Sequence, residues 1–152
     1  MTDKSTVEFS LSRVVNAPPD LVFEGWTEPE RLKTWWGPKG FDHPVLKVDA
    51  RTGGEAEIVM GLPDGPKYHV SEVFREVDRP AKLAFSFKTA DSEGKVLLEG
   101  DITATFMKVG STTRLTVKAR STGHFASVAK ARAGFIAGWN QSLDRLIASC
   151  KK

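Results

Sequence analysis

The sequence SVAKARAGFIAGWNQSLDRLIASC at residues 127–150 determines the architecture, because its hydrophobic residues are spaced differently from those before it. They recur at steps of three, four and seven residues, which places them in one stripe along a helix. The stripe consists of Val128, Phe135, Trp139, Leu143, Leu146 and Cys150. We therefore expect one long helix over residues 127–149. Gly134 and Gly138 each cost about 1 kcal/mol relative to Ala in a helix interior, so we expect a sheet or a ligand to approach the helix closely there.

The chain before this helix consists mainly of segments in which apolar and polar residues alternate, as they do in half-buried strands. A first strand is expected over residues 6–15, and six more follow further along the chain. Turn sequences rich in Gly, Pro and Asp separate several of them. The six are expected at residues 41–50, 55–60, 68–77, 82–88, 95–107 and 112–120.

Two short helices are expected between the first and second strands. The prolines at residues 18 and 19 end the first strand and suit the first turn of a helix over residues 20–26. The sequence TEPE that follows has the spacing of a capping box, in which Thr27 and Glu30 satisfy each other's backbone N–H groups. It predicts a second short helix over residues 28–36.

The order of these elements predicts an α+β fold. Short turns between consecutive strands indicate an antiparallel meander, and a sheet with one apolar face needs a cover, which the long helix supplies. We expect a helix-grip fold, in which a curved seven-stranded antiparallel sheet wraps around the C-terminal helix and two short helices follow strand 1. One helix cannot fill such a sheet, so we also expect a cavity between them. The 152 residues are expected to form a single domain, residues 1–152.

Composition and charge limit the possible partners. Hydrophobic residues make up 40% and charged residues 27% of the chain, a balance typical of globular proteins. Residues 108–152 carry nine Lys or Arg and one acid, whereas the rest of the chain is net acidic. The basic residues are spread over a strand and a helix, which does not favour nucleic acid. Complementary surfaces on two copies instead suggest a weak homodimer.

Neither export nor a membrane partner is expected. No stretch approaches the length of a membrane span, and the first residues lack the apolar core of a signal peptide. The one cysteine, Cys150, forms no disulfide framework and is expected to be a buried small hydrophobe. A cytoplasmic location follows.

We expect neither a metal site nor a cofactor. The three histidines, His43, His69 and His124, have no zinc-binding spacing, and no nucleotide-binding glycine motif occurs. His69 is expected at the surface.

The inner surface of the expected sheet and helix is rich in aromatic side chains. Trp35 and Trp36 are adjacent on a short helix, so one is expected to pack on the sheet edge and the other to face the cavity mouth. Trp139 is expected to be deeply buried. The residues predicted to line the cavity and bind a ligand are Trp35, Trp36, Met60, Tyr68, Phe85, Phe87, Ile102, Phe106, Arg132, Phe135 and Trp139.

Two arginines interrupt the apolar pattern, and a buried unpaired charge is costly. Arg13 falls on the apolar phase of the first strand, where we expect a salt bridge with Glu24 or Asp20. Arg132 falls near the centre of the helical stripe, so it is either exposed or placed to bind an acidic headgroup. Few other polar residues are in phase with the cavity: Tyr68 and Glu72.

Several short motifs together resemble the family of homologues of the activator of the heat-shock protein 90 ATPase, within the START-like or SRPBCC helix-grip superfamily. The resemblance extends from about residue 6 to residue 147. The motifs are Asn16-Ala17-Pro18, Val22-Phe23, Trp26-Thr27-Glu28-Pro29-Glu30-Arg31-Leu32, Trp35-Trp36-Gly37-Pro38, Arg75-Glu76-Val77 with Pro80 and Leu83, Gly138-Trp139, and Leu143-Asp144-Arg145-Leu146.

The resemblance implies a curved antiparallel sheet gripping a long C-terminal helix, with a largely apolar ligand cavity between them, and no catalytic set. This chain departs from the pattern at Ser86-Phe87, where such proteins often have Thr-Trp, and at Ser71-Glu72, where they often have Gly.

Three functions are compatible with this reading. The first is binding or carriage of an apolar or amphipathic small molecule. The second is an enzyme of the cyclase or hydrolase type acting on a hydrophobic substrate, which would need polar residues converging in the cavity. The third is a co-chaperone-like module that binds another protein.

Overall fold

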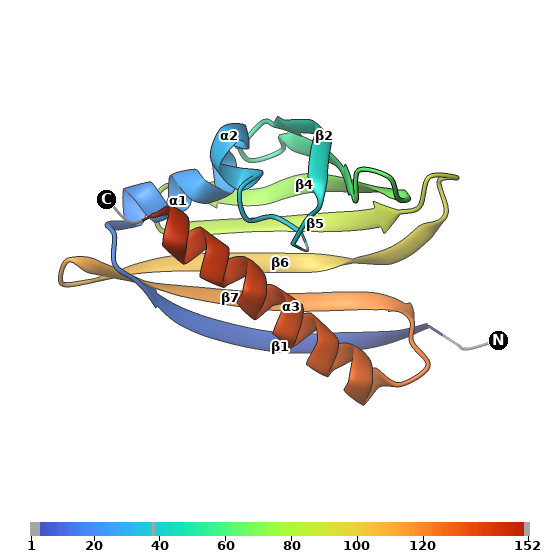
Figure 1. Ribbon diagram of the computed structural model, residues 1–152. Coiled ribbons are helices and arrows are strands. Elements are labelled where there is room, and N and C mark those ends of the chain that lie inside the picture. Colours follow the sequence, from blue (N-terminus) through green and yellow to red (C-terminus); the bar gives the residue numbers. More distant parts are fainter. Residues whose placement is uncertain (1–3, 38, 151–152) are drawn as a thin grey trace.

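The computed structural model describes residues 4–37 and 39–150 of the chain. These residues form seven strands and three helices, whose arrangement is drawn in Figure 1. In chain order they are β1 (Lys4–Val15), α1 (Pro19–Thr27), α2 (Pro29–Leu32), β2 (Asp42–Val48), β3 (Glu55–Gly61), β4 (Lys67–Asp78), β5 (Lys82–Ala90), β6 (Val96–Val109), β7 (Thr112–His124) and α3 (Val128–Ser149). The predicted helix-grip architecture is confirmed.

The strands form one antiparallel sheet in the order β1-β7-β6-β5-β4-β3-β2. Strands β2 to β7 follow one another as a meander, and β1 joins the far edge by pairing with β7 along its whole length, from Lys4 opposite His124 to Val15 opposite Thr113. Because side chains alternate across a strand, this register directs Val7, Phe9 and Val15 to the core.

Helix α3 crosses one face of the sheet, over β6, β7 and β1 (Figure 1). Its first turn is capped by Ser127, whose Oγ accepts from the Lys130 backbone N–H at 3.2 Å. Within the helix, the buried residues are Ser142, Leu143 and Leu146, all in the C-terminal third. The N-terminal two thirds is therefore less closely packed against the sheet.

Helices α1 and α2 cover the same face of the sheet near the C-terminal end of α3 (Figure 1). Phe23 and Trp26 of α1 pack edge-to-face on Phe106 of β6, with ring centroids 5.2 and 6.1 Å from it. The part of the inner face beneath α1 is filled in this way, and the part beneath the start of α3 is not. No helix in the described part of the chain is long and apolar enough to cross a membrane.

The predicted capping box is not formed. Thr27 is the last residue of α1, and its hydroxyl donates to the Phe23 carbonyl oxygen at 3.3 Å. Helix α2 begins at Pro29 without a side-chain cap and ends at Leu32, four residues before the expected end. Proline at the first helical position already supplies a preset backbone angle, so α2 begins without the Thr27 cap.

Arg13 forms an ion pair, but with a partner on a different element from the one predicted. Its Nη2 lies 2.5 Å from Oδ1 of Asp144 on α3, and its Nη1 donates to Asn140. Of the two expected partners, Glu24 and Asp20, Glu24 instead pairs with Arg31 and Arg79. The strand therefore carries Arg13 to the edge of α3 rather than to α1.

Candidate functional site: an apolar cavity beneath the C-terminal helix

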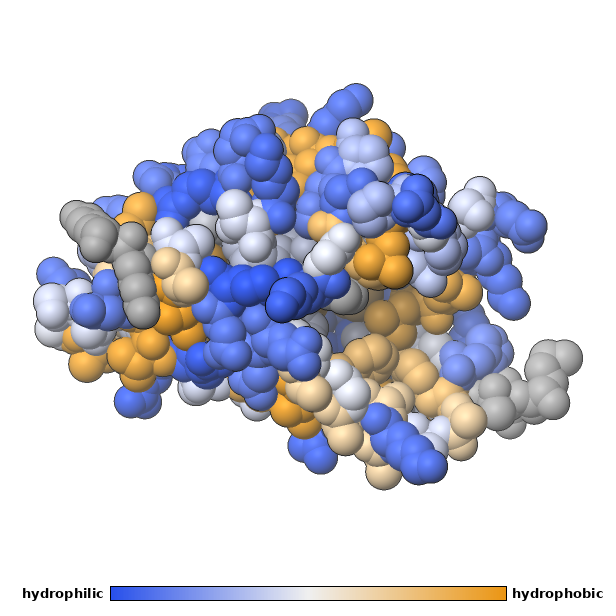
Figure 2. All heavy atoms as spheres, in the orientation of Figure 1, coloured by the Kyte–Doolittle hydropathy of each residue, from blue (hydrophilic) through white to orange (hydrophobic). Residues whose placement is uncertain are grey.

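A cavity of about 330 Å³ lies between the sheet and the middle of α3, at residues 134–142. Figure 2 shows hydrophobic side chains in a hollow of this face, beside that part of the helix. The cavity is bounded by three tryptophans, by inner-face residues of β3 to β7 and by one side of α3. Its lining consists of Trp35, Trp36, Gly37, Met60, Val70, Phe87, Thr89, Leu98, Ile102, Ser121, Gly134, Phe135, Gly138, Trp139, Gln141 and Ser142.

Most of the residues predicted for the cavity are among those that bound it. These are Trp35, Trp36, Met60, Phe87, Ile102, Phe135 and Trp139. The residues on strands alternate with outward-facing residues, and Phe135 and Trp139 recur along the helical stripe of α3. These are the patterns from which they were predicted.

Three predicted aromatic residues lie outside the lining. Phe106 is covered by α1, as described above. Phe85 is buried and packs edge-to-face on Phe74, with ring centroids 5.8 Å apart. Tyr68 stacks on Phe41 at 6.3 Å, beyond the cavity wall. The alternation along the strands correctly predicts that these three side chains lie on the inner face of the sheet. Neighbouring side chains then cover them, so they do not line the cavity.

Arg132 also lies outside the lining, which corrects its prediction as a cavity residue. Its side chain is exposed, and its Nε donates to the backbone carbonyl oxygen of Glu8 on β1 at 3.0 Å. The position is within the helical stripe, but the long side chain leaves the helix toward the sheet edge.

Of the two neighbours expected beside the helix glycines, a sheet or a ligand, the sheet does not approach them. A Cβ atom built on Gly134 or Gly138 would have no neighbour within 4 Å, although both residues line the cavity. Nothing packs against these backbone segments. The missing side chains leave an opening along α3 instead.

The four tryptophans of the chain form one cluster at the closed end of the cavity. Trp26 lies 4.8 Å from Trp35 and 6.0 Å from Trp139, measured between ring centroids. Trp36 lies 5.7 Å from Trp139 in an edge-to-face arrangement. Trp35 is fully buried and its Nε1 donates to the Gly25 carbonyl oxygen at 2.8 Å. Trp139 is only half-buried, unlike the prediction, because one side of it borders the cavity.

A turn after α2 contributes Trp36 and Gly37 to the cavity wall, and three side chains hold it. Arg145 Nη2 donates to the Gly37 carbonyl oxygen at 2.5 Å, and Ser142 Oγ donates to the same oxygen at 3.4 Å. His43 Nε2 donates to the Trp36 carbonyl oxygen at 2.8 Å. Burial is the main cause that lowers the pKa of His43. The turn is thus fastened to α3 on one side and to β2 on the other.

Gly37 itself cannot be replaced without strain. Its φ is 84°, and a Cβ there would lie 2.9 Å from the sulfur of Met60 across the cavity wall. Only glycine adopts this conformation readily.

The lining contains no charged residue in the part of the chain that the structure describes. Its polar side chains are those of Thr89, Ser121, Gln141 and Ser142. Cys150 is buried, as predicted, and burial raises the pKa of its thiol. His69 is exposed, also as predicted. No group of three or more His, Cys, Asp or Glu side chains within residues 4–37 and 39–150 could hold a metal ion.

One acidic group lies just behind the cavity wall. Glu72 of β4 is only 5% exposed, and its Oε2 has no hydrogen-bond partner. Burial raises the pKa of this carboxyl to about 8. Glu72 was among the few polar residues predicted to be in phase with the cavity. Among those residues, all of which the structure describes, it is the one with a buried side-chain atom that has no hydrogen-bond partner.

A curved sheet that wraps around a long helix, with an apolar cavity between the two, is the architecture of a helix-grip protein. Residues 16–150 match the family described as activator of Hsp90 ATPase homolog 1-like protein. The chain belongs to this family.

Solved structures share the fold over nearly the whole chain. A protein from Rhizobium leguminosarum is 17% identical, with 99% of this chain and 97% of that chain covered and a TM-score of 0.84. A protein from Nitrosomonas europaea is 28% identical, with 94% and 93% covered and a TM-score of 0.75. The AHSA1 protein from Silicibacter pomeroyi is 23% identical, with 93% and 96% covered and a TM-score of 0.77. A comparison with the curated proteins gives no match.

Proposed function

We propose that the protein binds an apolar or amphipathic small molecule in the cavity beneath α3. The observation that carries this proposal is the lining: a space of about 330 Å³ bounded by Trp35, Trp36 and Trp139, with no charged residue among the described residues that line it. Concave, mostly apolar sites of this size are typical of small-molecule binding. Apolar surface that is left open to water has no compensating contact, whereas an apolar ligand would bury it.

The simplest test combines detection of a retained molecule with binding of a known probe. Native mass spectrometry of freshly purified protein would reveal a bound small molecule. Propylbenzene, titrated calorimetrically, should bind and raise the melting temperature, because a ligand that binds only the folded state stabilises it by mass action.

A blocking variant shows whether binding occurs in this cavity. Gly138→Leu places a side chain in the open space beside α3, where a Cβ meets nothing within 4 Å. It should weaken propylbenzene binding at least tenfold while leaving the fold intact, because Leu favours the helix more than Gly does. Ala137→Leu is the matched control, since Ala137 is exposed on the same turn of α3 and does not line the cavity. Equal binding by both variants would remove the cavity from consideration.

An enzymatic role and a protein partner remain weaker hypotheses. Of the polar residues expected to converge on the cavity, Arg13 pairs with Asp144 and Tyr68 packs on Phe41. The small polar groups that do line it resemble an orienting set more than an acid–base pair. We place the protein in the cytoplasm as part of the same proposal, with weak self-association through its acidic and basic surfaces.

A further inference from the structure

Glu72 lies where the wall of the cavity meets the closed part of the core. On β4 it follows Val70 by two residues, so the two side chains share the inner face of the sheet. Across the ladders, Glu72 is directly opposite Phe87 of β5 and Ala56 of β3. Val70 and Phe87 both line the cavity. Direct cross-strand neighbours have Cβ atoms about 5 Å apart, so the carboxyl is one side chain away from the cavity.

No described residue around Glu72 forms a hydrogen bond with its buried Oε2. Its neighbours on the inner face are Ala56, Val70, Phe74 and Phe87, none of which is titratable. Its Oε2 is sealed from solvent without a hydrogen-bond partner among the described residues. A buried polar group without a partner destabilises the folded state, because it loses its hydrogen bonds to water. Such a group in a wall otherwise built for apolar contact requires an explanation beyond packing.

At neutral pH this carboxyl is a hydrogen-bond donor rather than an anion. Burial is the cause that raises its pKa to about 8, and no neighbouring cation opposes the effect. A protonated carboxyl has one O–H to donate. The group that complements it is a neutral oxygen acceptor, because an anion would find no positive charge in the lining.

We propose that Glu72 is the polar anchor of the cavity and donates a hydrogen bond to a carbonyl oxygen of an otherwise apolar ligand. The inference rests on the proposed function and narrows it to a ligand class: ketones, esters or amides with an apolar body, rather than amines or carboxylic acids. Phe87 is the cross-strand neighbour of Glu72 and lines the cavity, so the ligand carbonyl would reach the carboxyl beside this ring.

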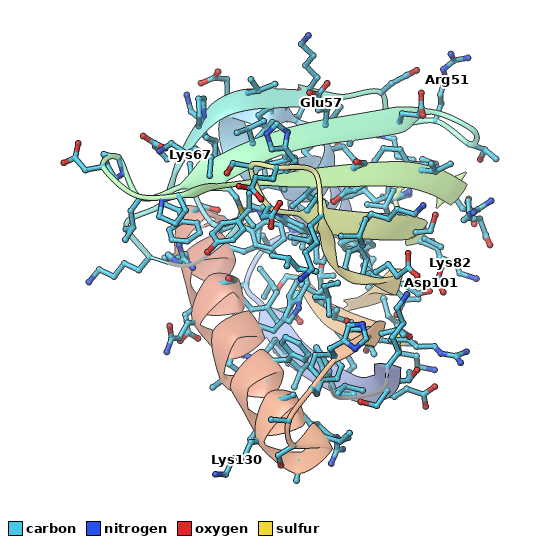
Figure 3. The ribbon with its side chains drawn as sticks, turned by 90° about the vertical axis from the view of Figure 1, so that its right-hand side faces the viewer. Arg51, Glu57, Lys67, Lys82, Asp101 and Lys130 are labelled. Atoms are coloured by element: carbon cyan, nitrogen blue, oxygen red, sulfur yellow. The ribbon has the colours of Figure 1, made fainter. Side chains whose placement is uncertain are left out.

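Three probes with one carbon skeleton test this assignment. Propylbenzene has no polar group, propiophenone replaces one methylene by a carbonyl, and α-ethylbenzylamine carries an ammonium on the same carbon. Affinities are measured by calorimetry on the wild-type protein and on three variants. Glu72→Met removes the donor, and Glu72→Gln keeps a neutral donor. Glu57→Met makes the same change at an exposed position of β3 (Figure 3).

The expected result is selective. Glu72→Met should weaken propiophenone about fivefold to tenfold, the worth of one hydrogen bond, and leave propylbenzene unchanged. Glu72→Gln and Glu57→Met should keep the wild-type affinity for both. In the wild type, propiophenone should weaken as the pH rises from 6 to 9.5, because the ionised carboxyl has no proton to donate, whereas Glu72→Gln should show no such change.

The other outcomes contradict the inference in distinguishable ways. If propylbenzene and propiophenone respond equally to Glu72→Met and to pH, the carboxyl does not touch the ligand, although the cavity binds it. If α-ethylbenzylamine is the probe that depends on Glu72, the ligand class is a cation and the carbonyl assignment is wrong. If no probe binds the wild type, the proposed function and the inference both fail. The wild-type pH series decides the matter even where Glu72→Met does not fold.

Discussion

The indole rings of Trp26 and Trp139 stack 6.0 Å apart between centroids, with an angle of 16° between their planes. Trp26 belongs to α1 and Trp139 to α3. The stack therefore joins α1, which covers the filled part of the core, to the helix that lies over the cavity. Trp139 also borders the cavity. The same ring therefore stabilises the docking of α3 and forms part of the site, which makes it the first residue to test.

Trp139→Ala should destabilise the protein by about 2–4 kcal/mol, at or below the usual cost of truncating a core tryptophan, because the ring is only half-buried. Urea unfolding followed by circular dichroism gives the free energy. The loss should also enlarge the cavity and change its ligand preference toward bulkier apolar probes. Lys118→Ala, at an exposed position of β7, is the control and should change stability little. Wild-type stability in Trp139→Ala would show that the stack does not hold α3 in place.

The protonation of Glu72 predicts a pH dependence of stability with a definite sign. The folded-state pKa of about 8 lies above the ordinary value of 4.5 for a glutamate carboxyl, so folding disfavours the ionised form. The free energy of unfolding should be highest below pH 4.5 as far as this group is concerned. It should fall between pH 4.5 and 8, by an amount on the order of 5 kcal/mol at most, and stay level above pH 8.

Glu72→Gln supplies the comparison, because it keeps the shape and removes the titration. The difference in unfolding free energy between Glu72→Gln and the wild type, measured by urea denaturation, should grow from pH 5 to pH 8. A difference that is constant over this range would mean that the carboxyl is charged and solvated in the folded protein.

Much of the fold was predictable because its signals are local. Alternation with a period of two marks each strand, and a change to helical spacing at residue 127 marks α3. The lining residues Phe87 and Ile102 followed from the same alternation. Phe106 was predicted from it too, but Phe106 does not line the cavity, because α1 docks over it. The sequence spacing contains no information on where a separate helix docks.

Long-range partners were the least predictable part. The charge of Arg13 on an apolar strand phase correctly indicated an ion pair, but the partner depends on the direction in which α3 crosses the sheet. Gly134 and Gly138 were correctly recognised as unusual in a helix. Of the two neighbours expected beside them, the sheet is absent, since open space lies there, and the ligand belongs to the proposed function. Ser142 and Gln141 carried no signal that could assign them to the cavity.

The ion pair between Arg13 and Asp144 should contribute little. The Asp144 side chain is 63% exposed, so water and salt screen the pair. A double-mutant cycle with Arg13→Met and Asp144→Asn should give a coupling energy of about 0.2–1 kcal/mol that shrinks in high salt. A coupling well above 1 kcal/mol would indicate that the pair is part of a larger network that positions α3.

Arg145 should matter more, because it fastens the turn that lines the cavity. Its Nη2 donates to the Gly37 carbonyl oxygen and to Ser142 Oγ. Arg145→Met should lower the unfolding free energy by about 1–3 kcal/mol, as expected for a hydrogen bond from a charged donor. Because Trp36 precedes Gly37, the tryptophan emission of the folded state should also change. Arg114→Met, at an exposed position of β7, should alter neither quantity.

Substitutions at the glycines of α3 should raise stability and weaken ligand binding. Gly134→Ala and Gly138→Ala should each raise the unfolding free energy by up to about 1 kcal/mol, because alanine favours a helix interior and its Cβ meets nothing within 4 Å. Gly100→Ala is the contrasting case, since a Cβ there would collide with the Arg120 backbone carbonyl oxygen, and it should be destabilising. The same two helix substitutions narrow the opening along α3, so the affinity or the association rate of propylbenzene should fall as stability rises. If both variants gain stability without any loss of binding, the opening along α3 is not the route into the cavity.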